Sequence, residues 1–371
     1  MEIINVDFDE NRYNIHLGKG VINNISTLLK EQTNSKKVII VADIFFKKSI
    51  VKRVINSLEK FEIHTYFMEA GKANKNMNEV LKIYSILEEH DLARDSTLIA
   101  IGGGVIGDLA GFVASTWYRG MNLVHIPTTL MAMVDSSVGG KVAINFRQTI
   151  NAIGNYYHPI FTLMDLELIE SLPEREYNSG MAEVIKCAII NDKAFFELLE
   201  EHSKEILERK EKAVAKFIAK TIKIKIAHVK GDIREGSKRL LLNYGHTLGH
   251  AIEVSTAKNY QEQYRHGEGV SLGIMAVAYI AEHHLNLSSS LYKSYEKLFK
   301  TYHLPTTISA SKLGVTREEL LKKCLRNVLK DKKRVDNHLR IILATEIGKA
   351  SVYRDIPFSL IEESFKDIIK D

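Results

Sequence analysis

From residue 98 to residue 141 the chain reads LIAIGGGVIGDLAGFVASTWYRGMNLVHIPTTLMAMVDSSVGGK, its most informative stretch. The stretch opens with a short apolar run, residues 98–101, which is typical of a buried central strand. Glycines with the spacing G-x-G-x-x-G follow this run, at Gly102, Gly104 and Gly107. Glycines at such a turn let the main chain approach a diphosphate, and residues 106–113 favour a helix whose positive end would face that ligand.

The glycine spacing alone leaves two interpretations open, a dinucleotide site or a tight strand-to-helix turn without a ligand. The acid that normally binds the ribose, about 20 residues after the glycines, is missing, and Pro127 stands in that neighbourhood. Polar side chains among mostly apolar neighbours favour a site, and they are Asp108, Arg119, Thr128, Thr129, Asp135, Ser136, Ser137 and Lys141. We therefore predict a polar cleft at the ends of strands.

Strands and helices alternate through the first half of the chain. Strand patterns cover residues 38–42, 63–68, 98–101 and 123–126, and residues 79–89 have helical periodicity. This alternation predicts a parallel sheet that binds its ligand at the carboxyl ends of the strands, where Asp43, residues 102–104, Thr128 and Thr129 fall. We assign residues 1–165 to an α/β nucleotide-binding domain.

The second half of the chain has few strand signals. Helical patterns cover residues 167–172, 179–190, 194–229, 247–254 and 269–281. We assign residues 166–371 to a mostly α-helical domain. Because no low-complexity linker separates the halves, we expect the two domains to pack closely with a cleft between them.

The composition is that of an ordinary folded protein. Of 371 residues, 45% are hydrophobic and 26% are charged, which excludes a disordered chain. The net charge of +5 is small and no basic arm is present, so neither nucleic acid nor a membrane is an expected partner. Cys187 and Cys324 form no C-x-x-C motif, and residues 1–30 lack a continuous apolar segment. We expect a cytoplasmic protein.

The string LNYGHTLGHAIE, residues 242–253, indicates a metal site. It places His246, His250 and Glu253 at positions i, i+4 and i+7, on one face of a helix that begins near Gly245. His266 follows in the sequence HGEG. Histidines in this pattern suit a zinc-type site, although packed or surface histidines would give the same pattern.

A catalytic zinc site commonly takes three protein ligands, so an acidic ligand is needed beside the histidines. Glu183, in the otherwise apolar sequence SGMAEVIK, is one candidate, and Glu253 is the other. The spacing does not distinguish between them. Lys186 lies three residues after Glu183, and this pair could also be a simple surface ion pair.

A series of motifs in one order resembles the 3-dehydroquinate synthase family, within the sugar phosphate cyclases. The motifs are GGGVIGDLAGF, the pair Arg119 and Gly120, PTTL, VDSSVGGK, LPERE, GMAEVIK, GHTLGHAIE and HGE, and the resemblance as a whole spans residues 38–276. The resemblance implies an NAD-binding α/β domain, a helical domain that binds a divalent metal (zinc or cobalt), and an active site between the two. It also implies a homodimer.

The resemblance assigns roles to individual residues. The metal ligands it implies are Glu183, His246 and His266, with His250 as a neighbouring hydrogen-bonding group. The substrate-side residues it implies are Arg119 (reaching across the dimer), Lys141, Asn151, Lys186, Lys225, Arg239, Asn243, His250 and a lysine of the DKK sequence at residues 331–333, Lys332 or Lys333. The cofactor-side residues it implies are Asp43, Lys75, Gly103, Gly104, Val105, Gly107, Asp108, Thr128, Thr129, Asp135, Lys141 and Ser171.

The implied activity is that of a phosphate-eliminating lyase. The family converts 3-deoxy-D-arabino-heptulosonate 7-phosphate to 3-dehydroquinate and phosphate by transient oxidation with NAD, elimination, re-reduction and aldol closure. Many cations suit this substrate, because arginine and lysine bind its carboxylate and phosphate. The alternatives are another sugar phosphate cyclase, a metal-dependent polyol dehydrogenase, or a degenerate homologue that binds ligands without turnover.

The chain departs from the family pattern on the cofactor side. The sequence GKANK, residues 71–75, has Lys72 where an acid is usual, and Ile150 stands where a lysine generally precedes Asn151. Val142 and Ala143 replace the more usual Thr-Gly, and Ile233 replaces an acid. We expect the affinity for NAD to be weakened.

Overall fold

The computed structural model of the chain describes residues 1–8, 11–69, 71–147, 149–257, 263–332 and 339–371. Its residues form two compact units. The first unit comprises Met1–Pro173 and Val214–Ile233, and the second comprises Glu174–Ala213 and Arg234–Asp371. No helix within the described ranges has the length and apolar character that a membrane span requires.

This division differs from the boundary at residue 165 that we expected, because most of helix α9 (Glu211–Val229) groups with the first unit. Two ion pairs attach the helix to strand β1 (Glu2–Phe8) of that unit. Nζ of Lys223 lies 2.8 Å from Oε1 of Glu2. Nζ of Lys230, the residue after the helix, lies 3.1 Å from Oδ2 of Asp7.

The first unit is built on a seven-stranded sheet with the order β1-β2-β9-β6-β5-β3-β4. Beside β1, its strands are β2 (Asn11–Gly18), β3 (Lys37–Asp43), β4 (Glu62–Met68), β5 (Thr97–Gly102), β6 (Asn122–Pro127) and β9 (Phe161–Asp165). Within this seven-stranded sheet β1 and β2 pair antiparallel, and all other neighbouring strands pair parallel. The predicted parallel sheet is confirmed. The patterns at β3, β4, β5 and β6 were recognised in the sequence, whereas β1, β2 and β9 were not.

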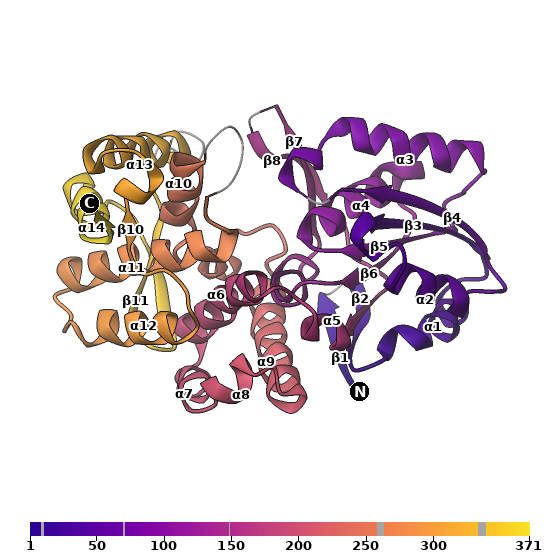
Figure 1. The fold of residues 1–371 in the computed structure, drawn as a ribbon, viewed down its shortest axis with the longest axis horizontal. Coiled ribbons are helices and arrows are strands. Elements are labelled where there is room, and N and C mark those ends of the chain that lie inside the picture. The colour runs from indigo at the N-terminus through magenta and orange to yellow at the C-terminus, as the bar shows by residue number, and fades with distance from the viewer. Residues whose placement is uncertain (9–10, 70, 148, 258–262, 333–338) are drawn as a thin grey trace. The chain divides into compact units, whose positions relative to one another are not determined.

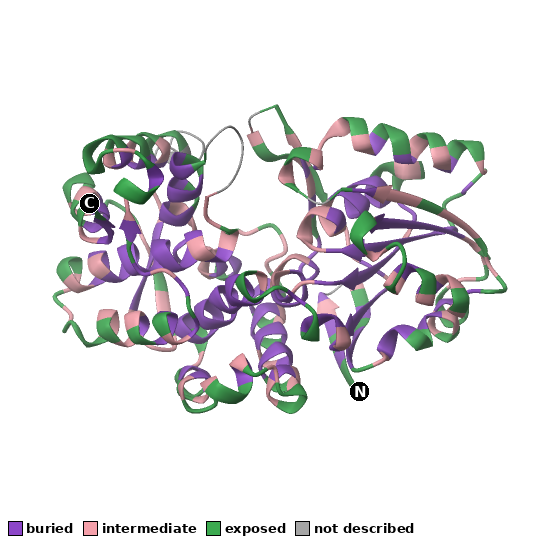
Figure 2. Ribbon diagram, in the orientation of Figure 1, coloured by how far each residue is buried: buried purple, intermediate pink, exposed green. Residues whose placement is uncertain are grey.

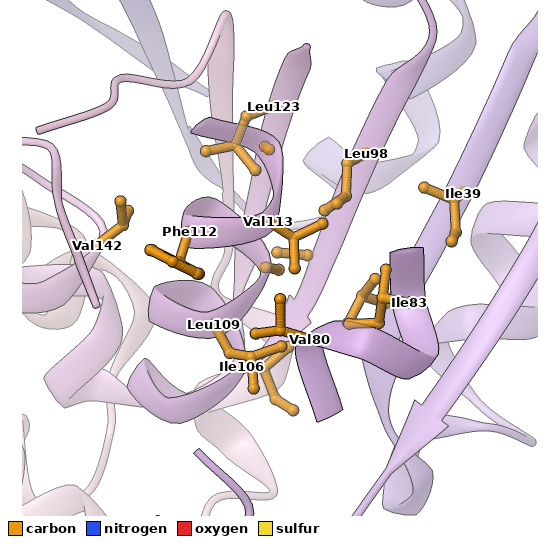
Figure 3. Close-up of a cluster of buried hydrophobic side chains, with 14 of the residues drawn as sticks. Ile39, Val80, Ile83, Leu98, Ile106, Leu109, Phe112, Val113, Leu123 and Val142 are labelled. Carbon is orange, nitrogen blue, oxygen red and sulfur yellow. The ribbon is translucent and has the colours of Figure 1, made fainter. Parts of the chain in front are cut away.

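Helices α3 (Met77–Glu89) and α4 (Gly104–Thr116) bury apolar faces against this sheet. Figure 3 shows Val80 and Ile83 of α3 beside Leu109 and Val113 of α4, with Leu98 of β5 in the same cluster. Each such side chain, when fully buried, stabilises the fold by about 1.5–3 kcal/mol. The remaining helices and turns of this unit are η1 (Val21–Asn24), α1 (Ile25–Gln32), η2 (Ile44–Phe46), α2 (Ile50–Ser57), η3 (Lys72–Asn74), η4 (Trp117–Arg119), η5 (Ala132–Ser136) and α5 (Glu167–Glu170).

A separate hairpin of strands β7 (Lys141–Phe146) and β8 (Thr149–Tyr156) lies outside the large sheet (Figure 1). It packs on α4, where Gly111 leaves room for Val142, because a Cβ on Gly111 would lie 2.4 Å from Cγ1 of Val142. Figure 3 shows Val142 beside Phe112 of α4, and both belong to the same buried cluster. Val142 and Ile144 of β7 therefore belong to the core of the first unit, whereas most of β8 is exposed.

The second unit is mostly helical, as predicted, and α6 (Glu174–Asn191) and α11 (His266–His284) run through its buried centre in Figure 2. Its other helices are α7 (Lys193–Glu201), α8 (Ser203–Leu207), η6 (Lys238–Asn243), α10 (His246–Thr256), α12 (Ser290–Thr301), η7 (Ser311–Leu313), α13 (Arg317–Lys332) and α14 (Phe358–Ile368). Two small sheets complete it, β10 (Ile308–Ser309) with β13 (Ile369–Lys370), and β11 (Ile341–Glu346) with β12 (Lys349–Tyr353).

Candidate active site

The glycine turn lies at the carboxyl edge of the large sheet. Gly102 ends β5, Gly103 precedes α4, and Gly104 is the first residue of that helix. The N–H of Thr128 donates to the carbonyl oxygen of Gly102 over 3.0 Å, which ties the end of β6 to the end of β5. No side chain caps α4, so its first N–H groups have no side-chain acceptor. The turn has the features of an anion-binding site.

Close packing explains why glycines occupy this turn. A Cβ on Gly104 would lie 3.0 Å from Oγ of Ser136, and one on Gly103 would lie 3.3 Å from Cγ2 of Thr129. The structure therefore brings together the turn, the end of β6 and the π-helical turn η5, all of which the sequence analysis selected. Val105 and Gly107 lie in the first turns of α4. Asp43 ends β3, and its carboxylate accepts from the N–H of Phe45 over 3.0 Å.

Lys75, Asp108 and Asn151 form one polar cluster, in which Lys75 is buried, Asp108 is partly buried and Asn151 is exposed. The amino group of Lys75 donates to Oδ2 of Asp108 and to Oδ1 of Asn151. Burial raises the pKa of Asp108 above its ordinary value, and the charge of Lys75 opposes this rise. Three residues far apart in the sequence, on the turn η3, on α4 and on β8, thus meet at one point.

A second cation of the first unit is held in the same manner. Lys225 of α9 is 6% exposed, and its amino group donates to the carboxylate and to the backbone carbonyl of Asp135 in η5. Lys225 was selected from a lysine-rich segment, and its contact with a selected aspartate sets it apart from the exposed lysines around it.

Other residues selected in the first unit lie nearer its surface. Lys141 is exposed at the start of β7. Arg119 is exposed in η4, where Tyr118 and Arg119 have φ values of 47° and 63°. Left-handed backbone is unfavourable for such residues and is often found at functional positions. Ser171 ends α5, and its N–H donates to the carbonyl oxygen of Ile169.

The structure brings Glu183, His246 and His266 together in the second unit. They come from α6, α10 and α11, and one ligand atom of each lies within 4.8 Å of the others. Oε1 of Glu183 lies 3.4 Å from Nε2 of His246 and 3.7 Å from Nε2 of His266. A tetrahedral ion with bonds of about 2.0–2.1 Å separates its ligand atoms by about 3.3–3.4 Å. The spacing suits a divalent metal.

The unmet hydrogen-bonding capacity of Glu183 supports the same fit. This residue is 1% exposed, and Oε1 has no hydrogen-bond partner among the described residues. The other oxygen, Oε2, accepts from the amino group of Lys186. A buried carboxylate oxygen without a partner is costly unless a cation compensates it.

Neighbouring groups orient both imidazoles. Nδ1 of His246 lies 3.2 Å from the carbonyl oxygen of Tyr244, and Nδ1 of His266 lies 2.9 Å from Oε1 of Glu253. Hydrogen bonds at Nδ1 leave Nε2 of each ring unprotonated for a metal. Burial, and then the charge of Lys186, lower the pKa of His246 well below its ordinary value, which favours the neutral ring.

The second ligand set, His250 with Glu253 and His266, is less suitable. Its atoms also lie within 4.8 Å of one another. Oε1 of Glu253, however, bonds to Nδ1 of His266, so Glu253 orients a histidine whose Nε2 faces Glu183. His250 is exposed, with its ring 5.4 Å and 5.5 Å from those of His246 and His266. The geometry favours Glu183 over Glu253.

Glycines that the sequence analysis did not use allow the three helices to meet. A Cβ on Gly267 would lie 1.8 Å from the carbonyl oxygen of Ser179, and one on Gly273 would lie 2.0 Å from that of Gly245. The N–H of Gly267 also donates to Oγ of Ser179 over 3.1 Å. Glycines clustered around GHTLGHAIE and HGEG were the available signal for this close packing.

Three further residues that the resemblance implies, Lys186, Arg239 and Asn243, lie in the second unit. Arg239 is buried in η6, with Nε 3.9 Å from Oε1 of Glu235, and Asn243 ends that turn. Lys186 is 2% exposed on α6. Asp331 and Lys332 of the DKK sequence are the last two residues of α13, and Lys333 lies outside the described residues.

Comparison with known sequences decides the family. Residues 65–179 match the profile of the 3-dehydroquinate synthase N-terminal domain, and residues 180–334 match that of its C-terminal domain. The 3-dehydroquinate synthase of Desulforamulus reducens is 37% identical over 96% of this chain and 97% of that protein. That of Thermodesulfovibrio yellowstonii is 36% identical over 100% of both chains. The chain belongs to the 3-dehydroquinate synthase family.

Solved structures share the fold of this synthase family member at lower identity. A 2-deoxy-scyllo-inosose synthase, complexed with carbaglucose-6-phosphate, NAD+ and Co2+, superposes with a TM-score of 0.88 at 24% identity, covering 99% of this chain and 100% of that one. The 2-epi-5-epi-valiolone synthase ValA of Streptomyces hygroscopicus, with NAD+ and Zn2+ bound, gives 0.85 at 24% identity over 96% of both chains. The predicted resemblance and fold class are confirmed.

Proposed function

We propose that this chain is a 3-dehydroquinate synthase that converts 3-deoxy-D-arabino-heptulosonate 7-phosphate into 3-dehydroquinate and phosphate. The observation that carries the proposal is the cluster of Glu183, His246 and His266 beside Lys186, in a chain that matches synthases over nearly its full length. Its cofactors would be NAD and a divalent metal, zinc or cobalt, as in the related cyclases that hold NAD+ with Co2+ or Zn2+.

The metal site would consist of Glu183, His246 and His266. A divalent ion there supplies Lewis acidity to a substrate hydroxyl, and NAD supplies a temporary acceptor for its hydride. Glu253 and the carbonyl of Tyr244 keep the two imidazoles in the ligand tautomer. His250, exposed beside both rings, is the group we assign to holding a proton near the reacting hydroxyls.

The dinucleotide side would be the carboxyl edge of the large sheet. The uncapped start of α4 suits the diphosphate, and Asp43 at the end of β3 suits a ribose hydroxyl. The clusters of Lys75 with Asp108 and of Lys225 with Asp135 would fix charge beside the cofactor. Thr128, Thr129, Val105, Gly107 and Ser171 complete the cofactor-side set that we propose.

The substrate carries a carboxylate and a phosphate, and we assign their binding to the cations that the resemblance implies. Lys186 is held by Glu183, and Arg239 is buried in η6, so both present a fixed charge. Lys141 and Asn151 of the hairpin and Asn243 of η6 would complete the set. The leaving phosphate itself would serve as the base for its elimination, so the chain need only orient it.

We propose that the protein is a cytoplasmic homodimer in which Arg119 contacts the substrate of the second subunit. The turn at Tyr118 and Arg119 supports this role, because both residues are exposed and left-handed backbone at such residues is often found at functional positions. Sedimentation would give the oligomeric state, and Arg119→Ala should lower turnover without dissociating the dimer.

The cofactor-side departures lead us to propose a weakened affinity for NAD. Lys72 stands where the family usually has an acid, and Ile150 stands where it generally has a lysine. Ile150 is 50% exposed, so its burial does not compensate for the absent lysine charge. Ile150→Lys should tighten NAD binding in a calorimetric titration. A wild-type affinity equal to that of its relatives would contradict the proposal.

The activity test is phosphate release and product identity with the heptulosonate phosphate, NAD and zinc or cobalt, while the absorbance of NADH is followed. Phosphate and dehydroquinate in equal amounts, without accumulating NADH, would establish the synthase. Accumulating NADH would indicate a polyol dehydrogenase. Turnover only with a sugar phosphate that lacks the carboxylate would indicate another cyclase, and binding of NAD and metal with no turnover of any of these would indicate a degenerate homologue.

A further inference from the structure

The β7–β8 hairpin is irregular at one point. Ile144 pairs with Ile153, but Phe146 pairs with Thr149, so Asn145 alone lies opposite residues 150–152. A bulge of this kind bends a strand and redirects a side chain, and bulges are frequent beside active sites. Asn151, inside the bulge, has a φ of 52°. The bulge turns Asn151 toward Lys75 and Asp108.

Asn145 bonds to both segments that meet at this bulge. Its Oδ1 accepts from the N–H of Asn151 over 2.9 Å, and its Nδ2 donates to the carbonyl oxygen of Lys72 over 3.0 Å. Its own N–H donates to the carbonyl oxygen of Lys75 over 2.8 Å. Asparagine can accept and donate through one side chain at once, which alanine cannot do and aspartate can do only in part.

These bonds have a consequence for the departures in the sequence. Asn145 bonds to the backbone of Lys72 and of Asn151 and to neither side chain. The unusual lysine at position 72 and the unusual isoleucine at position 150 therefore leave this attachment intact. The amino group of Lys75 then reaches Asp108 and Asn151 from a turn whose two ends are both fixed by Asn145.

We propose that Asn145 is a positioning residue for the dinucleotide: it fastens the turn of residues 72–75 to the bulge of β8 and so holds Lys75 and Asn151 against Asp108. This inference rests on the proposed function, because it takes the cluster to face NAD. It adds a residue that the family resemblance did not select, and one whose effect passes through other groups.

The test compares the full-length wild-type protein with Asn145→Ala, Asn145→Asp and Asn155→Ala. Asn155 is a matched control, since it lies exposed on the same hairpin and its Oδ1 accepts from the adjacent N–H of Tyr156 rather than from another segment of the described chain. Calorimetry would measure NAD affinity without turnover, and hydrogen–deuterium exchange would report on residues 71–77 and 149–153 without any ligand.

Asn145→Ala should raise the Kd for NAD about tenfold and accelerate exchange in both segments, with exchange in β5 unchanged. Asn145→Asp should accelerate exchange at residues 71–77 only, because the carboxylate still accepts from Asn151 but cannot donate to Lys72. Asn155→Ala should behave as the wild type in both measurements. Wild-type exchange at residues 149–153 in Asn145→Asp would show that Asn145 positions this segment, because a general loss of stability would accelerate exchange there as well.

Three outcomes would overturn the inference, and the last differs from the first two because it also overturns the proposed function. If the wild type binds NAD and Asn145→Ala binds it equally well, Asn145 does not position the site. The same conclusion follows if exchange rises throughout the unit rather than in the two segments. If the wild type does not bind NAD at all, the proposed function fails and the role of Asn145 toward NAD fails with it.

Discussion

At the scale of single residues, Glu183 has two carboxylate oxygens in different surroundings. One accepts from Lys186, and the other faces two imidazoles without a hydrogen bond. Leaving a buried polar group unsatisfied costs about 1–3 kcal/mol, and more when the group is charged. A metal ion at Oε1 would remove this cost, so the carboxylate should matter more for metal affinity than for folding.

We expect Glu183→Gln to lower zinc affinity more than about a hundredfold, because the amide keeps the volume but loses the charged ligand. Glu253→Gln should lower it about 10- to 100-fold, since Glu253 only orients His266. Competition with a chelator would measure both affinities, with circular dichroism as the folding control. A larger loss for Glu253→Gln than for Glu183→Gln would mean that Glu253 is the ligand.

Lys75 and Asp108 give a prediction with a pH dependence. Lys75→Met should destabilise the fold by about 3 kcal/mol at neutral pH, because it leaves the Asp108 carboxylate, which is only 18% exposed, without its lysine partner. Burial already raises the pKa of Asp108 above 3.8, and loss of the lysine would raise it further. The protonated acid is then the stable folded form.

The sign of the pH effect follows from that raised pKa. The stability of Lys75→Met should be closest to that of the wild type below about pH 4, where Asp108 is protonated in both the folded and the unfolded protein. It should fall as the pH rises through the pKa of Asp108 in the folded protein. Urea unfolding at pH 4 and pH 7.5 would measure the difference. A deficit in Lys75→Met that is equal at both pH values would show that the lost interaction is not with the ionised carboxylate.

At the scale of elements, the sequence predicted what periodicity encodes. The central strands β3, β5 and β6 are continuous apolar runs, and α10 begins at His246 after Gly245, close to the predicted start. The run of residues 194–229 was predicted as one helical stretch, but it divides into α7, α8 and α9, with Arg209 at a φ of 57°. A break of this kind depends on the backbone conformation of a few residues. It leaves the spacing of the apolar residues unchanged, so the sequence pattern does not reveal it.

Parts of the site were unpredictable for a related reason. Asn145 is an ordinary strand residue in the sequence, and its importance appears only when the bulge of β8 lies opposite it. The contact of Lys75 with Asn151 joins residues that no local pattern connects. Metal ligands were easier to find because two of the three histidines and Glu253 share one helical face. The spacing left Glu183 and Glu253 both open, and only the family resemblance favoured Glu183 before the packing of α6 against α11 was known.

That packing supplies a prediction at the level of helices. Gly267→Ala should lower zinc affinity about a hundredfold or more, because its Cβ would overlap the carbonyl oxygen of Ser179 and move His266 away from Glu183. Ser179→Ala removes only the hydrogen bond to the N–H of Gly267, so it should change affinity less than about fivefold. Equal losses in the two variants would mean that helix spacing does not control the metal site.

At the scale of the whole molecule, the two units hold different parts of the chemistry. The residues selected for NAD all lie within Met1–Pro173, joined by Lys225 from α9, whereas the metal ligands all lie in the unit that contains α6, α10 and α11. Each unit has its own buried core. The assignment of α9 to the first unit matters here, because it places Lys225 and Asp135 in one compact body.

This division predicts that the two cofactors stabilise the protein separately. Zinc at a hundred times its Kd should add about 2.7 kcal/mol to the free energy of unfolding of the unit that binds it. Its removal by a chelator should therefore lower the transition temperature of that unit alone. The Kd for NAD should change by less than about threefold in the metal-free protein, because its residues belong to the other unit. Differential scanning calorimetry, with and without each cofactor, would resolve the transitions. A large loss of NAD affinity on metal removal would show that the units bind their cofactors cooperatively, and the independence argued here would then be wrong.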